Sequence, residues 1–383
     1  MQSLFKLLKR EIRLVTSDHS LLLTLLIAPV LYAFFYGSIY SQKEEKEVKI
    51  AVVDADGSSL SRLITQQLDL SEMAEVQSAP NLTNAKYQLH IGAVQGYLYL
   101  EKGLEKKILS LEQAHAVLAL NTSRFLPSSD LLSTITRITL TAGVGVRRKY
   151  LKKKGKGSVI STQEANPVRL NYKPLYNEKG SYGSFLLPGL LALILQQTLL
   201  IGLAASMAVE RQNKKIPELL QWGKNSFSAI LWGKGLFYFL LFACYALFFL
   251  TINFNILQLP NRADPLQISL LMGLFLLTII PMGLWIGSLF KSQILSVQLM
   301  AFSSYPIFLI TGYSLPFESL PKVVQGISVL LPTTPFLLSY QSMVQTGSSL
   351  FENKGHLIHL IVLWLFFCGL FLWRMKRLKK KQI

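Results

Sequence analysis

Residues 185–209 read FLLPGLLALILQQTLLIGLAASMAV, an apolar run that contains no charged residue. The hydrocarbon core of a bilayer is about 30 Å thick, and a helix needs about 20 apolar residues to cross it. Charge returns directly after the run, at Glu210 and Arg211. Because lipid tolerates only a backbone that satisfies its own hydrogen bonds, this stretch predicts a transmembrane helix.

Five further runs meet the same criterion. They are Ser20–Tyr40, Gly235–Leu259, Leu266–Phe290, Ser292–Phe317 and Leu357–Trp373, the last being the shortest. Charged residues make up only 16% of the 383 residues, which is too little polar surface for a soluble globule of this size. The first run exceeds the usual core of a signal peptide, so we expect a retained anchor. The composition predicts an α-helical polytopic membrane protein with six transmembrane helices.

Basic residues gather near three membrane borders and set the expected orientation. They are Lys6, Lys9, Arg10 and Arg13, then Arg211, Lys214, Lys215 and Lys224, and finally Arg374, Lys376, Arg377, Lys379, Lys380 and Lys381. Such clusters favour the cytoplasmic side, which places both termini in the cytoplasm and agrees with an even number of spans. This topology accounts for the formal net charge of +18, so we expect no nucleic-acid partner.

The region 41–183 is long enough to form an extracytoplasmic domain of its own, and its pattern predicts an α/β fold. Strands are expected at Val48–Val53, Gly96–Leu100, Ala116–Leu120 and Val168–Tyr172, with a helix over Ser128–Lys154. The turn that ends in Ser58 is expected to cap a helix containing Leu60 and Ile64. The basic stretch Arg147–Lys156 is expected to be a solvated helix end, with an acidic partner as the alternative.

The expected layout of the chain follows from these segments. It comprises a cytoplasmic amphipathic helix at 1–19, the first span at 20–40, the α/β domain at 41–183, spans two to six within 184–374 and a basic tail at 375–383. Within the second membrane part, we expect a cytoplasmic loop at 209–234 and an outer-leaflet segment at 316–335. The apolar face of the first helix is expected to consist of Leu4, Phe5, Leu8, Ile12 and Val15.

The sequence lacks signatures of catalysis. It has no G-x-x-x-x-G-K-[ST] phosphate loop, and Gly233-Lys234 has neither the spacing nor the Ser or Thr that must follow. No G-x-S-x-G hydrolase motif occurs, and we expect no metal site and no cofactor on this chain. The six apolar runs also contain essentially no acid or base at mid-depth, unlike ion-driven carriers. A transport function would therefore take its energy mechanically from a partner.

Several local motifs together resemble the ABC-2 type permeases, the membrane subunits of ATP-binding-cassette exporters. They span nearly the whole chain and include Lys9–Arg13 with Ala28-Pro29, Ile50–Asp54 with Ser58–Ser61, Phe185–Gly189, Gly283–Ser288, and the Leu-Pro pairs at 315, 320 and 331. The chain looks most like the multidrug-exporter subgroup that has a large extracytoplasmic domain after the first helix. The resemblance implies an exporter of the bacterial cytoplasmic membrane.

The resemblance also implies partners. These are a separate ATPase subunit that carries ATP and magnesium, and a second permease copy or paralogue. Membrane lipids, a periplasmic adaptor and an outer-membrane channel are further candidates. The rival from another class is a non-transporting membrane scaffold or sensor whose outer domain binds an envelope partner.

The loop after the second span is the expected contact for the ATPase. The candidate coupling residues are Glu210, Arg211, Pro217, Glu218, Leu219, Leu220 and Trp222. Lys214, Lys215 and Pro217 replace the family's usual Gly, Thr and Glu. We expect Glu210 and Arg211 to pair with each other or with a partner, and Leu219, Leu220 and Trp222 to offer a compact apolar surface. A solvated loop that only sets topology is the alternative.

The resemblance further implies that the second and fifth spans line a pathway between subunits. The polar lining candidates are Gln196, Gln197, Thr198, Ser303, Ser304 and Thr311, although hydrogen bonding between helices is the alternative role. A short outer-leaflet helix between Pro321 and Pro332 is a candidate external gate. Its apolar residues are Val323, Val324, Ile327, Leu330 and Leu331. The sequence does not identify a substrate.

Overall fold

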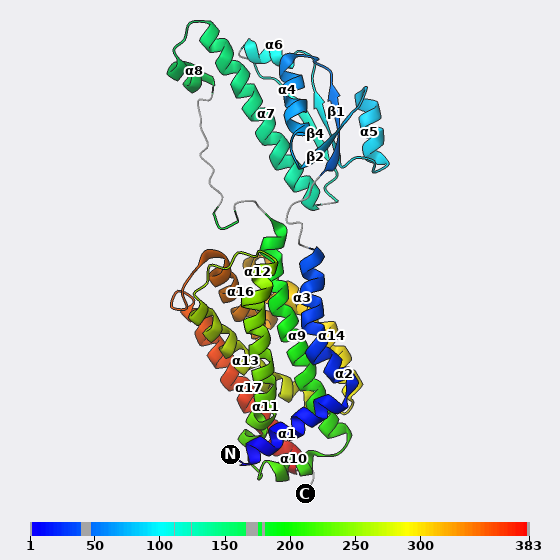
Figure 1. The fold of residues 1–383 in the computed structure, drawn as a ribbon, viewed down its shortest axis with the longest axis vertical. Helices are drawn as coiled ribbons and strands as arrows, with labels where there is room; N and C mark the ends of the chain where they lie inside the picture. Colours follow the sequence, from blue (N-terminus) through cyan, green and yellow to red (C-terminus); the bar gives the residue numbers. More distant parts are fainter. Residues whose placement is uncertain are drawn as a thin grey trace. The chain divides into compact units, whose positions relative to one another are not determined.

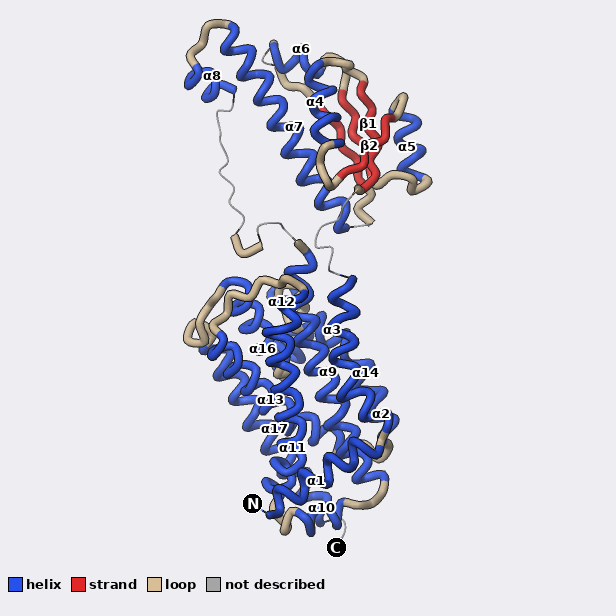
Figure 2. Tube along the Cα trace, in the orientation of Figure 1, coloured by secondary structure: helices blue, strands red, loops and turns tan. Residues whose placement is uncertain are grey.

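The computed structural model describes residues 2–39, 47–110, 112–123, 125–165, 175–177 and 181–380. The chain divides into two compact units. One consists of Met1–Ser41 and Leu175–Ile383 and is helical, and the other is the inserted segment Gln42–Pro174 (Figure 1). All strands of the described residues lie in the inserted unit (Figure 2).

The helical unit begins with α1 (Gln2–Ser17). The helices that follow are α2 (His19–Leu22), η1 (Leu23–Ile27), α3 (Ala28–Ile39), α9 (Tyr182–Gln212), α10 (Ile216–Trp222), α11 (Phe227–Phe248), η2 (Phe249–Asn253), α12 (Phe254–Ile256), α13 (Pro265–Gly287), α14 (Gln293–Ile310), η3 (Phe317–Ser319), α15 (Lys322–Val329), α16 (Thr333–Gln341), η4 (Ser342–Thr346) and α17 (Lys354–Lys380). Within the described residues, six helices are long and apolar enough to cross a membrane. The expected six spans are therefore confirmed by length and composition.

Two details of the predicted spans are wrong. The last span, Lys354–Lys380, has 27 residues, whereas the shortest is Gln293–Ile310 with 18. The third span begins at Phe227, eight positions before the apolar run that starts at Gly235. In both cases the helix continues past its apolar run into charged residues, because an apolar window marks the lipid-compatible part of a helix and not its ends.

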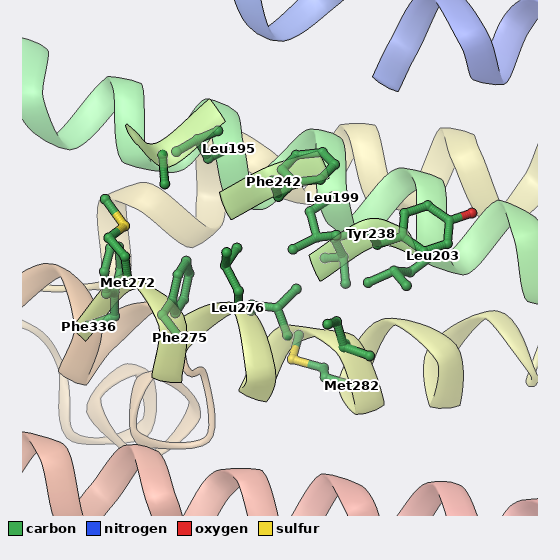
Figure 3. Close-up of a cluster of buried hydrophobic side chains, with 14 of the residues drawn as sticks. Leu195, Leu199, Leu203, Tyr238, Phe242, Met272, Phe275, Leu276, Met282 and Phe336 are labelled. Atoms are coloured by element: carbon green, nitrogen blue, oxygen red, sulfur yellow. The ribbon is translucent and has the colours of Figure 1, made fainter. Parts of the chain in front are cut away.

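The core of the helical unit is built around α9. This helix packs against α3, α11, α13, α14 and α16, and 94% of its apolar window is buried. Figure 3 shows leucines of α9 meeting Tyr238 and Phe242 of α11 and the side chains of α13. Close approach of α9 and α13 depends on Gly287, since a Cβ there would lie 2.7 Å from the Cα of Ala204.

The expected short helix between Pro321 and Pro332 is present as α15. The chain then turns by 91° into the helical stretch Thr333–Thr346, and the pair has the form of a broken span or a re-entrant loop. The second half of this pair was not predicted. Phe336 on α16 stacks on Phe275 of α13 with ring centroids 3.7 Å apart, so α16 belongs to the core of the helical unit.

The inserted unit is an α/β fold with a four-stranded sheet. Its elements are β1 (Val48–Asp54), α4 (Ser59–Asp69), β2 (Ala74–Ser78), α5 (Leu82–His90), β3 (Gly96–Leu100), α6 (Leu104–Leu109), β4 (Ala116–Leu120), α7 (Phe125–Lys153) and α8 (Ser158–Ala165). The strand order is β2-β1-β3-β4, with β1 parallel to β2 and β3, and β4 antiparallel to β3.

Both faces of β1 are buried, as is usual for a central parallel strand. Ile50 and Val52 pack with residues of α4, α6 and α7, whereas Ala51 and Val53 pack with Ala85 of α5. Ser58 caps α4 as expected, accepting a hydrogen bond from the backbone N–H of Ser61 at 3.1 Å.

The predicted strands at Gly96–Leu100 and Ala116–Leu120 are confirmed, and β1 extends the first predicted strand to Asp54. The expected strand at Val168–Tyr172 lies outside the described residues. Strand β2 was missed because its sequence, AEVQS, is mostly polar. It is an edge strand paired only with β1, so packing and not hydrophobicity determines its conformation.

Candidate functional site

Helix α10 connects the second and third spans and lies at the same end of the helical unit as α1 (Figure 1). Pro217 occupies the first turn and Glu218 adds a negative charge there, both of which favour a helix start. The helix ends at Trp222, before Lys224 and Asn225, which have positive φ values of 51° and 59°. Because α10 contacts α1, α9, α11 and α17, a displacement of α10 acts on four elements at once.

The apolar residues of α10 are divided between core and surface. Leu219 is fully buried and Leu220 is 5% exposed, and both belong to the core of the helical unit. The expected compact apolar surface of three residues is therefore wrong, because the helix uses its leucines to hold itself in place. Trp222, at the end of α10, is 40% exposed, and Pro217 in its first turn is exposed as well.

A cluster of four charged side chains lies next to α10, which it approaches through Arg10. This ionic cluster consists of Arg10 and Glu11 of α1, Glu210 of α9 and Lys234 of α11. The Arg10 guanidinium donates to both carboxylate oxygens of Glu210. The Lys234 ammonium lies 2.6 Å from Glu11 Oε2 and 3.4 Å from Glu210 Oε1.

The ionic cluster is buried and its charges balance. Glu11 and Lys234 are fully buried and Glu210 is 1% exposed. Ser206 Oγ and, at 2.9 Å, Tyr238 Oη donate to Glu11 Oε1. Removing an ion from water costs several kcal/mol, which is repaid only where partners are close and hydrogen bonds are complete. The cluster meets this condition, since each ion has an oppositely charged partner.

Arg10 also links the ionic cluster to α10. Its Nε lies 4.0 Å from a carboxylate oxygen of Glu218, whose side chain is 46% exposed. Burial disfavours the charged guanidinium, but hydrogen bonding and attraction from Glu210, with Glu218 nearby, hold the pKa of Arg10 above its ordinary value. The Arg10 side chain therefore remains a permanent charge between two helices.

Lys234 reaches the ionic cluster because two glycines flank it. A Cβ at Gly233 would lie 2.7 Å from Leu7 Cβ of α1, and one at Gly235 would lie 2.6 Å from Ile280 Cγ2 of α13. The Gly-Lys-Gly sequence thus allows close packing on two sides of α11 while the lysine points to the acids. The expectation of spans without acid or base holds for the apolar runs, but not for the longer helices that contain Glu210 and Lys234.

Glu11 and Lys234 were not among the predicted site residues. The face of α1 that is buried consists of Leu7, Glu11 and Val15, at a spacing of four residues, whereas Phe5 and Ile12 are 69% and 41% exposed. The predicted apolar face of α1 is therefore wrong in part. The signal available in the sequence was the i, i+4, i+8 spacing of Leu7, Glu11 and Val15, which places the acid on one helix face with two apolar residues.

Arg211 does not pair with Glu210. Its Nη1 donates to the backbone carbonyls of Ser288 at 2.6 Å and Phe290 at 3.1 Å, and Arg374 of α17 donates to Ser288 at 3.1 Å. These carbonyls follow the C-terminus of α13, where cations satisfy the unpaired acceptors and the helix dipole. Arg211 and Arg374 thus tie α9 and α17 to the C-terminal end of α13.

The pathway candidates belong to α9 and to α14 with its C-cap Thr311, two helices that pack against each other. Gln196, Gln197 and Thr198 are 0%, 7% and 5% exposed. Gln197 Nε2 donates to the carbonyl of Met300 on α14, while neither amide atom of Gln196 has a hydrogen-bond partner within the described residues.

The hydroxyls among the pathway candidates bond to their own helices or turns. Thr198 donates to Ile194, Ser303 to Met300, and Thr311 to Phe308, at 2.7 to 2.8 Å. Ser304 is partly buried. Among these candidates, Gln197 alone makes a hydrogen bond between α9 and α14 within the described residues.

The gate candidates form the surface of α15. Val323, Ile327 and Leu330 are 77%, 53% and 57% exposed, and Val324 is half-buried. Contacts of polar groups hold the helix at its end. Ser328 Oγ donates to the carbonyl of Ile310 at 2.6 Å, and His359 Nε2 lies 2.8 Å from the carbonyl of Val329.

Comparison with known proteins agrees with this architecture. The model of the ABC-2 family transporter protein matches residues 19–373. The probable multidrug ABC transporter permease YbhS of Escherichia coli K12 is 20% identical over 378 residues, which covers 96% of this chain and 95% of that relative. Its counterpart in Escherichia coli O157:H7 matches with the same identity and coverage. Since the family model covers nearly the whole chain, this protein belongs to the ABC-2 transporter family.

Proposed function

We propose that this chain is the membrane-spanning subunit of an exporter that is driven by ATP hydrolysis on a separate ATPase chain. The observation that carries the proposal is α10, a short helix held rigidly by buried Leu219 and Leu220 while Trp222 remains exposed. A rigid helix end with an exposed aromatic residue suits a groove on a soluble partner, since aromatic anchors dominate many interfaces. The family membership supports a permease, and the energy source and direction are part of the proposal.

The proposed orientation places α1, α10 and the basic tail in the cytoplasm and residues 42–174 outside. Lys214, Lys215 and Lys224 flank α10 and are exposed, as expected of residues on the cytoplasmic side of a membrane. The complex is proposed to contain two permease chains in the bacterial inner membrane. Movement of substrate is proposed to involve the contact between α9 and α14, with α15 at its outer end.

The proposal is tested by affinity purification of the tagged chain from native membranes. An ATPase of the ATP-binding-cassette class should co-purify, and Trp222→Ala should weaken its association by about 2 kcal/mol, or roughly thirtyfold. Trp232→Ala is the matched control, because Trp232 is 37% exposed, lies on α11 and is not part of α10. Recovery of the intact chain without any ATPase would favour the rival, a scaffold or sensor.

A further inference from the structure

The ionic cluster has a property that a simple structural ion pair lacks, because three of its members each face two oppositely charged groups. Arg10 faces Glu210 and Glu218, Lys234 faces Glu11 and Glu210, and Glu210 faces both Arg10 and Lys234. A small displacement of one helix can therefore exchange partners without leaving a charge unpaired. Buried apolar side chains would have to separate and repack to allow the same displacement.

The three helices that contribute to the ionic cluster, α1, α9 and α11, are among the four helices that α10 contacts. Glu210 precedes α10 and Lys234 follows it along the chain, whereas Arg10 and Glu11 belong to α1. Glu218 extends the set of charges onto α10 itself. The charges thus form a continuous path from α10 through Arg10 and Glu210 to Lys234 within α11.

Stability alone does not explain the presence of four ions at this position. Well-packed apolar residues of similar volume often hold buried contacts at least as well as an ionic group does. Leu7 and Gly233 already supply close apolar packing between α1 and α11 beside the cluster. What the ions add is a contact that can change partners while it remains closed to water.

We propose that the ionic cluster is a partner-exchanging contact through which movement of α10 reaches the membrane helices, with Arg10, Glu11 and Lys234 as positioning residues for coupling. When α10 is displaced, Arg10 shifts from Glu210 towards Glu218, and Lys234 moves closer to Glu210 while it stays paired with Glu11, which the Ser206 and Tyr238 hydroxyls hold in place. In this proposal α1 is a moving part of the coupling apparatus and not only an anchor in the headgroup region. The inference rests on the proposed ATPase docking at α10.

The test replaces the four ions by apolar residues of similar size, in the variant Arg10→Met, Glu11→Leu, Glu210→Leu and Lys234→Met. The complex with its ATPase is reconstituted in lipid, and hydrogen exchange of α9, α11 and α14 is compared with and without ATP plus vanadate. The wild-type complex should show a nucleotide-dependent change in exchange. The apolar variant should bind the ATPase and keep its melting temperature. Its nucleotide-dependent change in hydrogen exchange should be smaller than that of the wild type by at least about fivefold, the lower end of typical coupling between sites.

Two outcomes distinguish the inference from the function on which it rests. If the apolar variant keeps both the ATPase and the nucleotide-dependent change, the ionic cluster is structural and the inference is refuted while the docking stands. If neither the wild-type protein nor the apolar variant binds an ATPase, the proposed docking at α10 is refuted, and this outcome is distinct from failure of the inference. Should the fourfold variant not fold, the pair variant Arg10→Met and Glu210→Leu is used, because it retains the ion pair of Lys234 and Glu11. Loss of the change in this pair variant supports the inference, and its persistence refutes it.

Discussion

Replacing Lys234 by methionine should destabilise the helical unit strongly, because it leaves two buried carboxylates with one counterion. Lys234 is fully buried and lies 2.6 Å from Glu11 and 3.4 Å from Glu210. Removing one partner from a buried ion pair costs about 3–5 kcal/mol, since the remaining charge stays buried and uncompensated. For a domain of about 150–250 residues, each kcal/mol lowers the melting temperature by about 2–4 °C, so we expect a decrease of about 6–20 °C.

The assay is thermal unfolding of the detergent-purified protein, followed by loss of the monodisperse peak in size-exclusion chromatography. The double variant Lys234→Met and Glu11→Gln should recover most of the loss, because the glutamine still accepts hydrogen bonds from Ser206 and Tyr238 without a charge. Lys224→Met is the control, since Lys224 is exposed and such a change is usually within about 0.5 kcal/mol. Equal melting temperatures for Lys234→Met and Lys224→Met would show that the acids in the ionic cluster are not ionised, and the electrostatic reasoning would be wrong.

Three further expectations concern orientation and the inserted unit. After the two native cysteines are replaced, a cysteine at Lys102 should react with an impermeant thiol reagent from outside the cell and one at Lys215 should not; the reverse pattern would overturn the proposed topology. Residues 42–174 expressed alone should be soluble and unfold in one cooperative transition by circular dichroism, whereas aggregation would mean that this unit depends on other parts of the complex. Although partial burial raises the pKa of Asp56, hydrogen bonds from Ser58 and the backbone N–H groups of Glu105 and Gly103 hold this pKa below its ordinary value. The stability that Asp56 contributes is therefore fully present above the ordinary pKa and is lost as the pH falls through the lowered pKa. Asp56→Asn should therefore make acid unfolding of this unit less steep, and an unchanged pH profile would contradict that account.

The spans were predictable because the lipid requirement is a property of local composition. Each of the six predicted runs overlaps one of the six candidate spans, and the resemblance to ABC-2 permeases is confirmed by the family model. The stretch Thr333–Thr346 was missed for the complementary reason. It contains Thr333, Thr334 and Ser339 and is too short to cross a bilayer unbroken, so its burial depends on neighbours such as Phe275. Composition records contact with lipid, whereas contact between helices depends on tertiary structure.

The candidate site was predictable in its place along the chain, but not in which residues face outward. The loop between the second and third spans was recognised from the charges at its ends, and the structure forms α10 there. The sequence does not reveal that Leu219 and Leu220 point inward while Trp222 is exposed, because a helix of seven residues contains too few turns to show a periodic pattern. Arg211 was recognised as a charge beside Glu210, yet its contacts are with α13, about eighty positions further along the chain.

The ionic cluster shows why a search for apolar segments overlooks charges that are paired. Glu210 and Lys234 were treated as ends of spans and Arg10 and Glu11 as part of a cytoplasmic helix, because an isolated ion in lipid is too costly to be accepted. That cost applies to an unpaired charge, and it decreases when acids and bases from different helices meet in the folded protein. Glu11 lies 223 positions from Lys234, so no local window contains both members of the pair. The detectable signals were indirect: a glutamate within the buried stripe of α1, and a lysine between two glycines that allow neighbouring helices to approach. Such a charge at a position that geometry marks as buried implies an opposite charge elsewhere in the fold.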